Sequence, residues 1–110
     1  MNVPSMKSFS GRFGLHYAQE QLEESIPPHL WGGLYRYFEH GVDPGGFLRS
    51  VLEGDLFMAA ARADTGSAAA LHDLAMWIIW YAPSGSYGSR HTVELWMKRQ
   101  QAVDELVSEG

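Results

Sequence analysis

The stretch "GVDPGGFLRS", residues 41–50, joins two segments whose apolar residues recur at helical spacing. Before it, Leu30, Leu34 and Phe38 fall on one face of a helix that we expect to begin at or just after Pro28. After it, the apolar pattern resumes with the same period. The stretch is therefore interpreted as the joint between two helices.

One register gives each residue of the joint a structural role. We expect the first helix to end at His40, with Gly41 as the left-handed residue that follows it. Asp43 is then the N-cap of the next helix, and its carboxylate accepts a hydrogen bond from a backbone N–H of Gly45 or Gly46. Pro44 takes the first helical position, where its missing N–H costs nothing.

In the same register Val42 and Phe47 occupy the two positions of a hydrophobic staple. The alternative is an anion-binding loop, because paired glycines at the start of a helix often hold phosphate. Two features favour the joint over this alternative. The carboxylate of Asp43 repels an anion, and the stretch lacks the "GK[ST]" ending of a phosphate loop.

The remaining segments also predict helices separated by short breaks. A helix is expected over 15–25, and Gly54–Asp55 is a break after which Asp55 caps a segment that continues to residue 64. We expect Ser67 to cap a helix that ends near residue 82. The segment 83–89 is a loop, and Ser89 caps a last helix whose inner stripe runs from residue 93 to residue 107.

These elements predict an all-α fold, a compact bundle of four to six helices. Residues 1–14 are expected to form a flexible or extended arm, and residues 15–110 a single helical domain. Gly32 and Gly33 lie inside the first long helix, where glycine costs about 1 kcal/mol relative to Ala. Close approach of another backbone is the expected compensation.

Composition excludes several classes of function. The 110 residues include no cysteine, so disulfides, thiolate metal sites and cysteine nucleophiles are excluded. The formal net charge of −5 and the scattered basic residues disfavour direct binding of nucleic acid. No apolar run approaches the ~20 residues of a membrane span, and the N-terminus has no apolar signal region. We expect a cytoplasmic protein without membrane association.

Catalytic and metal-binding motifs do not emerge from the residue spacing. The five histidines offer no pair at i, i+3 or i, i+4, so no single helix presents a zinc pair. His72 and Asp73 form half of a metal-phosphohydrolase signature, whose other ligands the sequence does not place. We expect no catalytic residues, no metal and no cofactor. A small metal- or carboxylate-dependent helical enzyme remains the alternative.

Aromatic and acidic residues supply the candidates for partner binding. Four Trp, five Tyr and five Phe exceed what a small core encloses easily, and Trp and Tyr are favoured anchors of protein interfaces. They are either core residues or, for two or three of them, part of a binding patch. The candidate anchors and the densest acidic cluster are Trp77, Trp80, Tyr81, Tyr87, Glu20, Glu23 and Glu24.

The segment 26–64 resembles small proteins encoded by tailed phages and prophages, with the pattern P-P-G-x-F-L-x-x-V-L-x-x-D-L-x-x-A-x-x-R-A-D. Asp43 stands where the pattern has its first Pro, and "APSGSYGS", 82–89, resembles the family's P-x-x-x-W-G-S turn. In that turn Tyr87 takes the Trp position, and the resemblance covers about 26–98. The matching residues are Pro44, Gly45, Phe47, Leu48, Val51, Leu52, Asp55, Leu56, Ala59, Arg62, Ala63 and Asp64.

The resemblance implies a phage origin and life in the cytoplasm of a bacterial host. Short acidic phage proteins without cysteine are often non-enzymatic binders of host machinery, and anti-CRISPR proteins are one such class. We therefore expect a protein-binding module whose partner is a host or phage protein with a basic groove. A homodimer is also expected, through the apolar helix over 68–82 or through the last helix. A homo-oligomeric phage structural or regulatory component is a further alternative.

Overall fold

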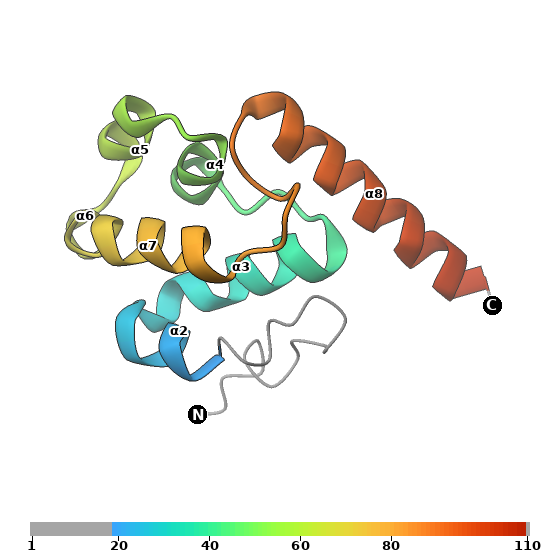
Figure 1. Ribbon diagram of the computed structural model, residues 1–110, viewed down its shortest axis with the longest axis horizontal. Coiled ribbons are helices and arrows are strands. Elements are labelled where there is room, and N and C mark those ends of the chain that lie inside the picture. The colour runs from blue at the N-terminus through green and yellow to red at the C-terminus, as the bar shows by residue number, and fades with distance from the viewer. Residues whose placement is uncertain (1–18, 110) are drawn as a thin grey trace.

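The computed structural model describes residues 19–109, which form seven helices and no strand. The all-α prediction is confirmed for this part of the chain. The predicted arm, 1–14, and the expected helical residues 15–18 lie outside the described residues. Figure 1 shows the arrangement. The helices are α2 (Gln19–Ser25), α3 (Pro28–His40), α4 (Gly46–Glu53), α5 (Leu56–Arg62), α6 (Thr65–Ala69), α7 (Leu71–Tyr81) and α8 (Arg90–Glu109).

The core is built around α3, which contributes more buried core residues than any other helix. α2 and α7 pack against each other, while α4 and α8 pack against α3. In Figure 1 α8 crosses the end of α3 and runs on away from the other helices. The buried core residues are Leu22, Ile26, Leu30, Trp31, Leu34, Tyr37, Phe38, Leu48, Leu52, Leu74, Trp77, Ile78, Val93 and Trp96.

The end of α3 follows the sequence prediction. Gly41 has φ 69° and ψ 24°, the left-handed conformation expected of the residue after a helix. Its N–H donates to the carbonyl oxygen of Tyr37 at 3.0 Å, and the N–H of Val42 donates to Arg36 at 3.2 Å. A Cβ on Gly41 would overlap the Met97 carbonyl oxygen, so glycine also lets α8 cross here.

The start of α4 corrects the predicted register, because Asp43 is not its N-cap. Gly45 is the residue before the helix, with φ 94° and ψ 164°, and Gly46 is the first helical residue. The Asp43 carboxylate does accept from the Gly45 N–H, at 2.9 Å, but it does so within the joint. Its other oxygen pairs with Arg49 at 2.7 Å. Among the amino acids only glycine readily adopts the conformation of Gly45. As a result, α4 begins two residues later than the sequence predicts.

The delayed start also removes the predicted staple. With Gly46 as the first helical residue, Val42 and Phe47 no longer occupy the positions before the cap and at the fourth helical residue. Val42 is exposed, and Phe47 packs partly against the core. Gly33 confirms the expected close approach of another backbone, since a Cβ there would lie 3.4 Å from the Pro44 carbonyl oxygen and 2.9 Å from Leu48. Gly32 does not, because the atoms nearest a Cβ there belong to the Arg36 side chain of the same helix, 2.9 Å away.

The segment 65–82 forms two helices rather than the one that the sequence predicts. Asp64 caps α6 by accepting from the Ser67 N–H at 2.7 Å. Ser67 is not the cap, because its buried hydroxyl lies 3.1 Å from Nε2 of His29. Ala70 separates α6 from α7.

The other predicted caps are confirmed. Asp55 accepts from the Met58 N–H at 3.1 Å, so the break at Gly54–Asp55 is present. Ser89 accepts from the Thr92 N–H at 3.1 Å at the start of α8. No helix among the described residues has the length and apolarity needed to cross a bilayer.

Candidate partner-binding surface

α7 has a buried face and an exposed face that are both apolar. Leu74, Trp77 and Ile78 are buried in the core. The opposite face carries Met76, Ile79 and Trp80, with exposed fractions of 37%, 59% and 73%. We call these three residues the α7 ridge. A large apolar surface that a fold leaves exposed is typical of a binding site.

The α7 ridge lies between two grooves. Figure 1 shows α7 with α5 above it and α2 below it. The α2–α7 groove has a volume of about 190 Å³ and is lined by Gln21, Ser25, Asp73, Met76, Trp77, Trp80 and Tyr81. The α5–α7 groove has a volume of about 570 Å³ and is lined by Val51, Gly54, Asp55, Leu56, Ala59, Ala68, Ala69, Leu71, His72 and Ala75.

The aromatic residues singled out in the sequence divide between core and surface. Trp80 belongs to the ridge, and Tyr81 is partly exposed beside it. Trp77 is buried with its ring 6.0 Å from that of Phe38, so it is a core residue and not an exposed anchor. Tyr87 is half-buried against the core. Of the predicted pair Trp77 and Trp80, the structure therefore favours only Trp80 as a contact residue.

The acidic cluster lies on α2, and two of its three residues lie beside the same groove. Glu20, Glu23 and Glu24 are all exposed. Because an α-helix has 3.6 residues per turn, Glu20 and Glu24 lie on the surface of α2 immediately beside the groove-lining residues Gln21 and Ser25. Glu23 lies further round, away from the groove. Together with Asp73 at the groove itself, acidic and aromatic groups therefore share one surface.

Sequence reasoning missed the apolar residues on α5. Leu56 and Phe57 have exposed fractions of 62% and 85%, and Leu56 lines the α5–α7 groove. The available signal was the run "LFM" directly after the break, which is three large apolar residues at the start of a short helix. Such a run cannot be buried entirely on one helix face.

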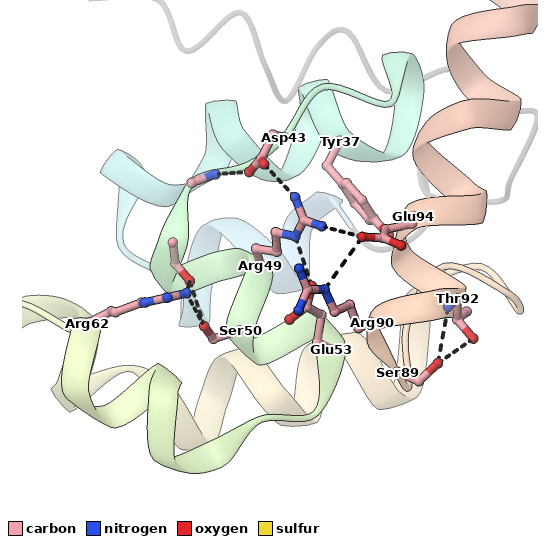
Figure 2. A network of polar contacts seen from close by, with 12 residues as sticks. Tyr37, Asp43, Arg49, Ser50, Glu53, Arg62, Ser89, Arg90, Thr92 and Glu94 are labelled. Carbon is pink, nitrogen blue, oxygen red and sulfur yellow. Dashed lines mark hydrogen bonds and ion pairs between the residues drawn. The ribbon is translucent and has the colours of Figure 1, made fainter.

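A network of charged residues holds the joint, α4 and α8 together (Figure 2). Arg49 is at its centre and pairs with Asp43 at 2.7 Å, Glu53 at 2.8 Å and Glu94 at 3.3 Å. Arg90 lies 3.5 Å from the same Glu94. The hydrogen bond from the Gly45 N–H, followed by Arg49, lowers the pKa of Asp43. The Asp43 carboxylate therefore has a structural role in the joint.

A second polar chain joins α3 to α8 through His40. Its Nδ1 lies 2.8 Å from Oδ2 of Asp104, and its Nε2 lies 3.0 Å from the hydroxyl of Tyr35. The sequence did not reveal this arrangement, because His40 and Asp104 are 64 residues apart. The contacts bind the end of α3 to α8.

His72 and Asp73 are both exposed at the start of α7. Among residues 19–109, no group of three or more His, Asp or Glu side chains is placed to hold a metal ion. Comparisons with known protein families, curated proteins and solved structures find no match for this chain.

Proposed function

We propose that this protein is a non-enzymatic binding module that docks onto another protein through the α7 ridge. The observation that carries the proposal is the exposure of Trp80 and Ile79 on a helix whose opposite face is already buried in the core. Because the core does not need these side chains, their exposure is explained best by a partner. Trp is the residue type most enriched at interface hot spots.

The partner that fits this surface is a host or phage protein with a basic groove. The chain carries a net charge of −5, and Asp73, Glu20 and Glu24 lie at or beside the α2–α7 groove. Complementary charge accelerates association and fixes orientation. The resemblance to phage proteins supports the sharper version: a stoichiometric inhibitor of a host defence complex such as CRISPR–Cas, acting in the host cytoplasm by masking a groove that normally holds nucleic acid.

Capture experiments with matched variants test this function. Wild type, Ile79→Asp and Leu106→Asp are immobilised and exposed to lysate of a bacterial host. Leu106 is the control because it is 70% exposed on α8, so both variants place the same charge on an exposed apolar site. We expect a partner that wild type and Leu106→Asp retain and Ile79→Asp loses. Equal retention by all three contradicts the proposal.

The captured partner then allows a titration that separates masking from catalysis. For a masking protein, loss of the partner's activity saturates near one equivalent of inhibitor. If one molecule inactivates many partner molecules, the protein is an enzyme and the proposed function is wrong.

A homodimer is the second candidate, and a different observation favours it. Phe57 is the most exposed large apolar residue described, and its neighbour Leu56 lines the α5–α7 groove. In a two-fold dimer each copy contributes the same patch, so an exposed side chain beside a hollow can be matched by the partner copy. Self-association of this kind would leave the α2–α7 groove open.

A further inference from the structure

We propose that the α2–α7 groove binds an arginine side chain of the partner, with the guanidinium stacked on Trp80 and paired with Asp73. This inference rests on the proposed function and specifies the chemistry that the partner presents. It concerns only the groove, whereas the proposed function rests on the α7 ridge as a whole.

The first observation is the position of Trp80 at the wall of the groove. Its side chain is 73% exposed, so its indole is available to a ligand. An arginine guanidinium stacks on an aromatic face through both cation–π attraction and planar contact, and Trp is the best partner among the aromatic residues. The methylenes of an arginine would also cover Met76, which lines the same groove.

The second observation is the charge around the groove. Asp73 lines it, and no Lys or Arg is found among the described residues that form its wall. Glu20 and Glu24 extend the negative potential along α2. A cation is therefore the charged group that this groove favours, and the same field opposes an anionic or acidic segment.

The third observation is a missing hydrogen bond. Oε1 of Gln21, a residue that lines the groove, is shielded from solvent and has no hydrogen-bond partner among residues 19–109. A shielded acceptor without a donor costs free energy. A guanidinium carries five N–H donors in a planar fork, so it can bind Asp73 and satisfy this oxygen once the amide turns toward it. Lysine has no planar group that could stack on the Trp80 indole.

A peptide titration tests the inference without knowledge of the partner. The probe is acetyl-Ala-Leu-Arg-Leu-Ala-amide, and its control replaces arginine with citrulline, which has nearly the same shape and no charge. Binding is followed by NMR through the indole N–H of Trp80 and through the backbone N–H of residue 73, which lines the groove and remains observable when Trp80 is replaced. We expect a saturable shift with the arginine peptide and a dissociation constant about tenfold weaker for the citrulline peptide, because cation–π and charge contributions of this size are lost.

Variants connect the binding to the named residues. Asp73→Asn and Trp80→Leu are both expected to weaken the arginine peptide several-fold, while Glu105→Gln, the same charge change on an exposed site of α8, leaves it unchanged. Equal affinity for the two peptides, an unchanged affinity in Asp73→Asn, or no shift at millimolar peptide each overturns the inference.

The captured partner distinguishes the two levels of failure. If Ile79→Asp abolishes capture while Asp73→Asn does not weaken it, the α7 ridge binds a partner and only the arginine site is wrong. If Ile79→Asp captures as well as wild type, the proposed function itself fails. A lysine peptide that binds more tightly than the arginine peptide also overturns the inference.

Discussion

The hydroxyl of Tyr37 donates a 2.6 Å hydrogen bond to the carbonyl oxygen of Ser86, which ties the last turn of α3 to the loop before α8. Burial is the main cause that raises the pKa of this phenol, so it remains a neutral donor. The carbonyl oxygen of Tyr37 in turn accepts from Nε1 of Trp96 at 3.1 Å. One residue of α3 therefore positions both the loop and α8.

Replacing Tyr37 by Phe tests this connection. The variant keeps the ring and leaves the buried Ser86 carbonyl without its donor, so we expect a loss of about 1–3 kcal/mol in the free energy of unfolding. Urea denaturation measures the change. Tyr81→Phe is the control, because Tyr81 is partly exposed and its change should stay within about 0.5 kcal/mol. Equal losses in the two variants would show that the Tyr37 hydroxyl stabilises the fold no more than the hydroxyl of the partly exposed Tyr81.

Glycine is required at residue 41 for two reasons that a pair of variants separates. Gly41 and Gly54 both adopt the left-handed conformation after a helix, with φ 69° and 78°. Gly54→Ala should cost about 1–2 kcal/mol from this conformation alone. Gly41→Ala should cost clearly more, because its Cβ also meets the Met97 carbonyl oxygen of α8. Similar unfolding midpoints would show that α8 moves aside without strain.

The Asp43 carboxylate predicts how the stability of the protein depends on pH. The pKa of Asp43 is lowered, first by the hydrogen bond from the Gly45 N–H and then by Arg49. Its contribution to stability is therefore complete above the unfolded pKa of about 3.9 and disappears as the pH falls through the lower folded value.

Comparison of wild type with Asp43→Asn across pH checks this sign. Because the side chain is 54% exposed, we expect a difference of only about 0.5–1 kcal/mol at neutral pH. The difference should be constant down to about pH 4 and shrink below it. A difference that instead grows in acid would contradict the assignment.

The exposed α5 residues predict the oligomeric state. We expect wild type to be a dimer at micromolar concentration and Phe57→Ser to be a monomer, because Phe57 is 85% exposed and its neighbour Leu56 lines the groove that a second copy would cover. Light scattering measures both. His91→Ser, an exposed site on α8, is the control and should leave the dimer intact. A monomeric wild type rules out the homodimer.

Local signals explain which parts of the fold were predictable. The ends of α3, the break at Gly54–Asp55 and the cap at Ser89 follow from proline, glycine and hydroxyl groups that act within a few residues. The start of α4 and the capping role of Ser67 were predicted wrongly. Gly45 takes the position before α4 while Asp43 pairs with Arg49, and Ser67 lies inside α6 with its hydroxyl against His29.

The candidate site was predictable in part for the same reason. Composition indicated a surplus of aromatic residues and an acidic segment, but spacing alone could not decide between Trp77 and Trp80. The packing of Phe38 against Trp77 decides it, and that contact joins residues far apart in the chain. The proximity of the acidic helix α2 to Trp80 follows only from the packing of α2 on α7.

The docking of α8 has a consequence for how long the folded state persists. The bond from Trp96 to Tyr37 spans 59 residues, and closing a loop of that length costs about 3–4 kcal/mol of chain entropy. The contacts between α4 and α5 close much sooner, so α8 is expected to dock after the folding transition state. Trp96→Phe should then accelerate unfolding and leave the folding rate nearly unchanged in stopped-flow measurements. Slower folding of Trp96→Phe would show instead that α8 docks in the folding nucleus. Contacts other than those of α8 would then determine the unfolding rate.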